Sequence, residues 1–376
     1  MNNTVYLDNS ATTVVCDRAI EYINHALSVN YGNPSSLHVM GMQAEEELRK
    51  SRAAVAAMLS CREDEIFFTG SGTEANNTAV FGAARARRKR GNRIVTTAVE
   101  HPSVLEAVKL LEDEGFEVIR LVPDVNGKIR EGDIFEAVNK DTVLVSIMLV
   151  NNETGALQPI KTARAAVTRA AAPALIHCDA VQGFGKMKIS VADLGIDLLT
   201  ASAHKIHGPK GVGILYKKKN VHIPAYIVGG GQESGLRSGT ESVPLISGLR
   251  GAIEELPKTD EKVRAVRDYA AELFGGCGFA KINSPTDALP YIINISVPGY
   301  RSETLLHYLE SKGIFVSSGS ACAKGAGSYV LRAAGLSSDR VDSALRISFS
   351  RFNSKEDVDR LFSALKAAKD TLRSSK

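Results

Sequence analysis

The chain has 376 residues, of which 44% are hydrophobic and 23% charged, and its formal net charge is +4. This composition is ordinary for a soluble globular protein, and the length favours two domains. The small net charge argues against a nucleic-acid-binding surface. No apolar run approaches the roughly 18 residues that a membrane span needs.

The N-terminal sequence "MNNTVYLDNSATT" lacks the basic-then-apolar order of a signal peptide. The cysteines are odd in number and form no CxxC pair, which argues against a disulfide framework or a zinc site made by this chain alone. We therefore expect a cytoplasmic protein that binds no metal and has free thiols at Cys16, Cys61, Cys178, Cys277 and Cys322.

The first two thirds of the chain alternate apolar runs with helical patterns. The run at 142–150 is almost continuously apolar, as expected for a strand buried on both faces. Strands spaced by helices of 10–15 residues indicate a mostly parallel sheet with right-handed crossovers. The strands are predicted at 65–70, 93–99, 116–122, 142–150, 174–179, 197–202 and 211–216, with helices at 73–90, 101–115 and 162–172.

The last third predicts a smaller α+β domain. A helical stretch from about 244 to 274 carries the chain out of the first layer, and strands at 291–297, 314–319 and 344–350 follow, with helices at 301–313 and 354–374. We assign 15–255 to a large domain, and 1–14 together with 256–376 to a small domain.

The run "ARARRKRGNR" at 84–93 concentrates positive charge in one place. Cations before a glycine at a helix C-terminus complement the helix dipole, and this is the favoured interpretation. Docking of an acidic partner or RNA is the alternative.

Polar residues follow successive predicted strands. In open α/β sheets, ligands bind just beyond the carboxyl ends of the strands, so we expect these residues to form one site. They are Gly72, Thr73, His101, Asn152, Asp179, Gln182, Ser202, His204 and Lys205.

Four of these motifs have a functional and a structural interpretation. The turn "GSGTEA" at 70–75 can present backbone N–H groups to a phosphate or be a plain tight turn. Lys205 in "SAHKIHGPKGVG" is either structural or a desolvated amine nucleophile. Asp179 either caps a helix or holds a protonated ring nitrogen, and His101 either caps a helix or stacks on a planar cofactor.

Together these residues meet the needs of a pyridoxal phosphate site. Such a site requires a phosphate cradle, a stacking ring, a carboxylate for the pyridinium nitrogen and a Schiff-base lysine, and the chain has them in that order. Arg346 in the small domain either orients an amino-acid substrate through its carboxylate or makes a surface ion pair.

Cys322 lies in "SSGSACAKGAG" at 317–327, a polar run that cannot bury a thiol. Free cysteine is usually buried, so a cysteine here is either accidental or present for its thiolate.

These segments resemble a known family. "YLDNSATT", "YGNPSSLH", "FTGSGTEANN", "EHPSV", "NNETG", "HCDAVQ", "SAHKIHGPKGVG", "RSGTE" and "SSGSACAKG" are similar, in order and spacing, to motifs of the NifS/IscS cysteine desulfurases. The resemblance covers nearly the whole chain. It implies a homodimer with the pyridoxal-phosphate-dependent aminotransferase-like fold (fold type I), which moves sulfur from L-cysteine to an enzyme persulfide and releases L-alanine.

The resemblance also implies roles for individual residues. Lys205 resembles the Schiff-base lysine, Asp179 the partner of the pyridine nitrogen, and Cys322 the sulfur acceptor. His101 resembles the stacking histidine and acid–base helper, and Arg346 the arginine for the substrate carboxylate. Phosphate contacts match Gly72, Thr73, Ser202, His204 and, from the other subunit, Thr240; Asn152 and Gln182 match groups near the ring's phenolic oxygen and the substrate.

The chain departs from the family pattern in two places. Ser10 stands where the group often has asparagine, and the loop after Cys322 is about two residues shorter than in the housekeeping iron–sulfur branch. Loop length sets where the cysteine can travel, so three sulfur acceptors are considered: an iron–sulfur scaffold, a tRNA-thiolation enzyme or another carrier. Alternative functions are a selenocysteine or other lyase of this fold, a nicotinamide dehydrogenase and a non-catalytic sulfur-relay scaffold.

Overall fold

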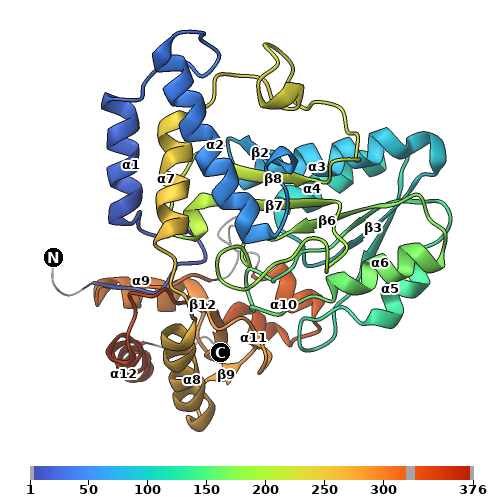
Figure 1. The fold of residues 1–376 in the computed structure, drawn as a ribbon. Coiled ribbons are helices and arrows are strands. Elements are labelled where there is room, and N and C mark those ends of the chain that lie inside the picture. Colours follow the sequence, from blue (N-terminus) through green and yellow to red (C-terminus); the bar gives the residue numbers. More distant parts are fainter. Residues whose placement is uncertain (1–3, 319–326, 373–376) are drawn as a thin grey trace.

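The computed structural model describes residues 4–318 and 327–372. Its centre is a seven-stranded sheet with strand order β2-β8-β7-β6-β5-β3-β4 (Figure 1). Neighbouring strands are parallel except at β8, which is antiparallel to both β2 and β7. The predicted mostly parallel α/β sheet is therefore confirmed. The strands are β2 (Ile66–Thr69), β3 (Arg93–Thr97), β4 (Glu117–Leu121), β5 (Thr142–Ser146), β6 (Leu175–Asp179), β7 (Leu198–Ser202) and β8 (Gly213–Lys217).

Two hydrophobic cores lie on the two faces of this sheet, because successive strand residues point to opposite sides. Leu144 belongs to the core formed with α3 and α4, whereas its neighbour Val145 belongs to the core on the other face. The helices of this part are α1 (Asp17–Ser28), α2 (Val39–Leu59), α3 (Gly72–Arg87), α4 (Pro102–Asp113), α5 (Glu131–Ala137), α6 (Ile160–Arg169) and α7 (Val243–Glu254).

A second, three-stranded sheet lies below the first in Figure 1 and is antiparallel, with order β12-β10-β9. The N-terminal β1 (Val5–Tyr6) pairs with β11 (Ile314–Phe315), so the start of the described chain lies with its last third. The domain boundaries themselves stay a prediction. The other elements are β9 (Lys281–Ile282), β10 (Ile292–Ser296), β12 (Ala344–Ser348), α8 (Glu261–Gly276), α9 (Ser302–Ser311), α10 (Tyr329–Ala333), α11 (Ser338–Asp342) and α12 (Lys355–Thr371).

Two predicted elements need correction. The helical stretch at 244–274 is two helices, α7 and α8, and the break between them contains Pro257, which cannot continue a helix. The strand predicted at 142–150 ends at Ser146, although residues 147–150 are apolar and buried. There the chain leaves the sheet toward the functional site.

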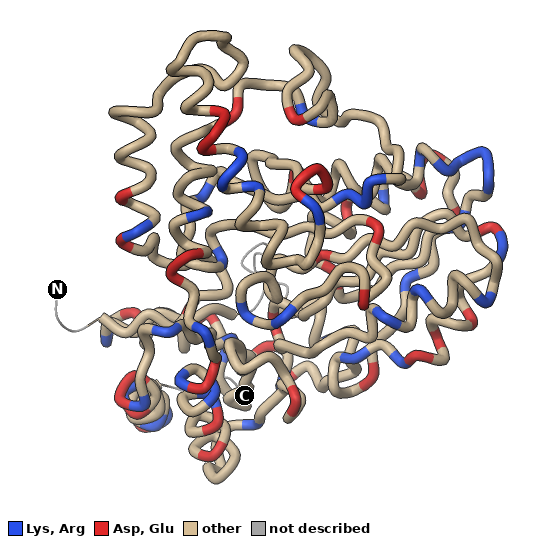
Figure 2. Tube along the Cα trace, viewed as in Figure 1, with Lys and Arg blue, Asp and Glu red and all other residues tan. Residues whose placement is uncertain are grey.

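The basic run at 84–93 lies at the end of α3, where Figure 2 shows a cluster of Lys and Arg. Several of its guanidinium groups have partners within the chain: Arg85 pairs with Glu114 at 2.5 Å, Arg93 pairs with Glu117, and Arg88 lies over the ring of Phe116. These contacts fit the favoured structural interpretation. Among the described helices, none is both long enough and apolar enough to cross a membrane.

Candidate active site

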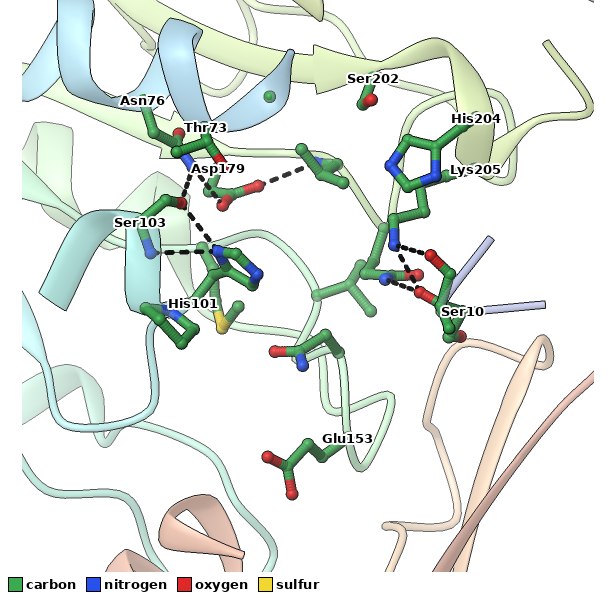
Figure 3. Close-up of a pocket in the computed structure, with 18 of the residues that line it drawn as sticks. Ser10, Thr73, Asn76, His101, Ser103, Glu153, Asp179, Ser202, His204 and Lys205 are labelled. Carbon is green, nitrogen blue, oxygen red and sulfur yellow. Dashed lines mark hydrogen bonds between the residues drawn. The ribbon is translucent and has the colours of Figure 1, made fainter. Parts of the chain in front are cut away.

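Most of the predicted site residues line one cavity of about 300 Å³ at the carboxyl ends of the parallel strands. In Figure 3, Lys205 and His204 enter it from one side, and His101 and Asp179 enter from the opposite side. The residues predicted at the strand ends therefore lie together around one cavity. The predicted residues that line the cavity are Gly72, Thr73, His101, Asn152, Asp179, Gln182, Ser202, His204, Lys205 and Arg346.

Helix α3 begins at the cavity wall. Ser71 caps it, and its hydroxyl accepts a hydrogen bond from the Glu74 N–H at 3.1 Å. Gly72 is packed closely, because an added Cβ would lie 3.2 Å from Val181 Cγ2 and 3.5 Å from Ser202 Cβ. The first N–H groups of a helix lack intrahelical acceptors and carry the positive end of the dipole, so this wall suits an anion.

Asp179 is the last residue of β6 and is 5% exposed. Its Oδ2 accepts from Asn76 Nδ2 at 2.8 Å, and its Oδ1 accepts from the Val181 N–H at 3.0 Å. The helix cap considered from the sequence is wrong, because turns and not a helix follow β6. The Val181 contact lies within this turn, whereas the Asn76 contact comes from α3. These two bonds leave further lone pairs of the carboxylate available to a cationic N–H donor.

His101 is the N-cap of α4, and its ring borders the cavity. Its Nδ1 accepts from the Ser103 N–H at 3.2 Å and lies 2.7 Å from Ser103 Oγ, which in turn accepts from Asn76 Nδ2. Because Nδ1 accepts, the proton of a neutral ring lies on Nε2. Burial lowers the pKa of His101, which favours this neutral form. His101 is therefore a cap and a cavity residue at once.

Lys205 follows β7 on a short 3-10 turn, Ala203–Lys205. Its Nζ donates to the carbonyls of Ser10 at 2.6 Å and Ala11 at 2.7 Å. Burial, with Arg346 adding to the effect, lowers the pKa of Lys205 to about 8, although Asp8 and Asp179 oppose the shift. With this pKa about a tenth of the amine is neutral at pH 7, far more than for an ordinary lysine, which makes Lys205 a usable nucleophile or base.

Arg346 lies on β12 and is 4% exposed. Its Nη2 is 2.9 Å from Asp8 Oδ1, and its Nη1 donates to the Asn152 carbonyl at 3.1 Å. The surface ion pair considered from the sequence is wrong, because this guanidinium is buried at the cavity. Asn152 also borders the cavity, and its buried Oδ1 has no hydrogen-bond partner within the described residues.

The remaining predicted residues, Gln182, Ser202 and His204, also line the cavity. Gln182 Nε2 donates to the Ser10 carbonyl at 3.0 Å, and Ser202 Oγ lies 3.4 Å from the Val212 carbonyl. His204 Nδ1 lies 3.2 Å from Thr12 Oγ1, and burial lowers the pKa of His204 to about 4.

One described residue among those predicted, Thr240, is not brought to the cavity. Thr240 is exposed and does not line it within this chain, so its predicted contact from a second subunit stays a prediction. Cys322 lies outside the described residues.

Several lining residues were not identified as part of the site from the sequence. Asn76 and Ser103 connect Asp179 to His101, and Ser10 holds Lys205. Asn76 had a signal: a polar residue in "EANNTAV" at a position where α3 is otherwise buried against the sheet. Glu153 and Tyr329 also line the cavity.

Comparison with known proteins gives a consistent result. The family described as aminotransferase class-V matches residues 5–361. The cysteine desulfurase IscS of Clostridium botulinum (strain Hall) is 40% identical over 379 residues, which cover 97% of this chain and 94% of that protein. A NifS/IcsS protein homolog of Lactobacillus delbrueckii subsp. bulgaricus is 42% identical over 371 residues, 96% of each chain.

Solved structures agree with these relatives. A NifS-like protein has a TM-score of 0.92 and 38% identity, with 98% of this chain and 100% of that chain covered. The structure of SspA in complex with cysteine has a TM-score of 0.83 and 33% identity, covering 93% and 100%. The chain therefore belongs to the class-V aminotransferase family and, within it, to the cysteine desulfurases of the NifS/IscS group.

Proposed function

We propose that this chain takes sulfur from L-cysteine onto Cys322 and releases L-alanine, using pyridoxal 5'-phosphate bound in the cavity. One observation carries the proposal: a lysine of lowered pKa faces a buried aspartate, a histidine and a helix N-terminus across one cavity.

The residues of the cavity fit this cofactor. The closely packed start of α3 at Gly72 and Thr73, with Ser202 and His204, suits the phosphate. Asp179 would hold the ring nitrogen, His101 would stack on the ring, and Lys205 would carry the cofactor. Asn152 and Gln182 would contact the phenolic oxygen side. When bound, pyridoxal phosphate acts as an electron sink for a carbanion at Cα.

The protein's own groups supply binding and proton transfer. Arg346 and Asn152 would hold the substrate carboxylate, since a guanidinium fork matches a carboxylate. Lys205 would take the Cα proton, which its lowered pKa favours. His101, with an N–H at Nε2, would assist the proton movements.

Sulfur transfer balances without an added oxidant. The Cys322 thiolate attacks the substrate sulfur, an S–S bond forms, and the C–S bond breaks with its electron pair left on carbon. That carbon takes a proton and becomes the methyl group of alanine. The net change is cysteine plus a thiol giving alanine plus a persulfide.

Three of the four described cysteines, Cys16, Cys61 and Cys178, are poor candidates for this role. All are free thiols, and Cys16 and Cys178 are buried. Burial raises the pKa of Cys16 and Cys178, and it raises the pKa of Cys61 to about 12. Because the thiolate is the nucleophile, these shifts support Cys322.

A homodimer is part of the proposal. The segment between α1 and α2, with the start of α2, and the long connection from β8 to α7 both reach the top of Figure 1. Both carry exposed large apolar side chains, and exposed apolar groups of this kind mark interfaces. Leu37 is 98% exposed, and Thr240 belongs to the connection from β8 to α7. The exposed residues include Leu37, Val39, Met42, Tyr226 and Val228.

One experiment tests the proposal. The purified protein is reduced with borohydride and its peptides are mapped, and a second sample is mixed with L-cysteine before alanine and persulfide are measured by mass. We expect the cofactor on Lys205 and the extra sulfur on Cys322. Cofactor on another lysine, or alanine released at the parent rate by Cys322→Ser, would refute it.

A further inference from the structure

The chain re-enters the described structure at Gly327, and the next two side chains are bound to the cavity wall. Ser328, which is 1% exposed, is the N-cap of α10. Its hydroxyl oxygen accepts from the Leu331 N–H at 3.0 Å, and its single proton is donated to Glu153 Oε2. The Tyr329 hydroxyl donates to the Glu100 carbonyl at 2.6 Å.

Both acceptors belong to the loops that carry the site. Glu153 directly follows Asn152, and Glu100 directly precedes His101. Glu153 is itself fixed: it is fully buried, its N–H donates to Asn151 Oδ1 at 3.0 Å, and its carbonyl accepts from Asn294 Nδ2 at 3.2 Å. The start of α10 is therefore tied to the two segments that follow β3 and β5.

The chain is also held on the other side of the 319–326 segment. Ser317 exchanges two backbone hydrogen bonds with Arg346, at 3.1 and 2.7 Å. Residues of the candidate site thus fix the backbone both before and after the segment whose sequence contains Cys322.

We infer that Ser328 is a positioning residue for the sulfur-accepting step, acting through Glu153. This inference rests on the proposed function. Cys322 precedes Ser328 by only six positions in the sequence, which limits the distance between their Cα atoms to about 20 Å. If Ser328 loses its contact with Glu153, the first fixed residue after Cys322 lies further along the chain. The thiol then spends less time near the substrate sulfur.

The variants isolate this contact. Ser328→Ala removes the hydroxyl, Ser328→Thr restores it, and Tyr329→Phe removes the second bond while keeping the ring. Ser337→Ala is the matched control, because Ser337 is the exposed N-cap of α11 and its side chain makes no cap bond.

Two stages are measured in the cofactor-loaded protein after rapid mixing with L-cysteine: the absorbance change as substrate binds, and persulfide on Cys322 by mass. Hydrogen exchange at 329–334, with and without cofactor, reports whether the start of α10 is held less firmly. We expect Ser328→Ala to slow persulfide formation by about tenfold, the typical effect of losing a buried hydrogen bond. The substrate-binding stage should change less than twofold, and hydrogen exchange at 329–334 should become faster. Ser328→Thr should recover the parent rate, Tyr329→Phe should be slowed in the same stage, and Ser337→Ala should match the parent.

Persulfide formation at the parent rate in both Ser328→Ala and Tyr329→Phe would overturn the inference, as would an equal slowing of both stages. If Ser328→Ala does not fold, Tyr329→Phe tests the inference instead: persulfide formation should slow while the substrate-binding stage stays nearly unchanged. A parent protein that forms no persulfide on Cys322 would refute the proposed function itself, so the two failures are distinguishable.

Discussion

Glu100 is a buried acid whose protonation should make stability depend on pH. The residue is fully buried beside the site, and its Oε1 accepts from Thr97 Oγ1 at 2.9 Å and from the Met148 N–H at 2.8 Å. Its Oε2 has no hydrogen-bond partner within residues 4–318 and 327–372. Burial, with the nearby Asp179 adding to the effect, raises the pKa of Glu100 from 4.5 to about 8.

The sign of the pH effect follows from the protons bound. Between pH 4.5 and 8 the folded protein holds a proton on Glu100 that the unfolded chain releases, so the free energy of unfolding falls as pH rises. The slope is about 1.4 kcal/mol per pH unit, which gives about 3 kcal/mol between pH 5.5 and 7.5. Below pH 4.5 both states are protonated and this penalty is absent.

Glu100→Gln removes this dependence while keeping the shape of the side chain. The amide oxygen replaces Oε1 as acceptor, and the NH₂ group replaces the acid O–H. For 376 residues, an unfolding entropy of about 2.1 cal/mol/K per residue converts 3 kcal/mol into a shift of about 4 °C in the thermal midpoint.

The assay compares thermal midpoints of parent and variant at pH 5.5 and 7.5. We expect the variant to gain about 4 °C relative to the parent on moving to pH 7.5. The exposed Glu106→Gln on the helix that follows, α4, is the control and should show no such gain. A difference between parent and Glu100→Gln that stays constant across this pH range would refute the buried-acid argument.

Three further predictions concern the candidate site and the interface. Asp179→Asn should weaken cofactor binding at least tenfold, since losing one partner of a buried charge pair costs about 3–5 kcal/mol; absorbance titration measures it, and unchanged affinity would leave Asp179 a turn residue only. In cofactor-free protein, acylation of Lys205, followed by mass, should rise with a midpoint near pH 8, because burial disfavours the cation; a midpoint above pH 10 would contradict this. Leu37→Glu should shift the mass in solution from dimer to monomer, measured by light scattering, whereas an unchanged dimer would exclude this end of the molecule as the interface.

The strand-end residues could be predicted from the sequence because their signal is local. Asp179, Ser202 and Lys205 each follow an apolar run, and parallel strands bring such positions to one edge. The same local signal overextended the strand at 142–150: residues 147–150 are buried beside the site, and a buried loop has the same apolar pattern as a buried strand.

The residues that connect the site could not be predicted in this way. Asn76 bonds Asp179 across 103 residues, and Lys205 bonds the carbonyl of Ser10 across 195 residues. Such contacts depend on how distant segments pack, and no propensity or period in the sequence encodes them. Helices α1 and α2 were missed as well, although they pack against α7.

The N-terminal segment links the two cationic groups of the site. The Ser10 N–H donates to Ser348 Oγ at 2.8 Å, and Asn9 Nδ2 donates to the Ser348 carbonyl at 2.8 Å, so residues 9 and 10 are fastened to β12, the strand that carries Arg346. The Ser10 carbonyl also accepts a hydrogen bond from Lys205 Nζ, and the Asp8 carboxylate forms an ion pair with Arg346. These bonds fix the separation between the proposed base and the proposed carboxylate-binding group, which lie on elements 141 residues apart in sequence (346 − 205). The short motif "YLDNSATT" therefore contributes to the site mainly through its backbone carbonyls and the Asp8 carboxylate. Ser10, which stands where the family often has asparagine, still supplies the carbonyl that accepts from Lys205.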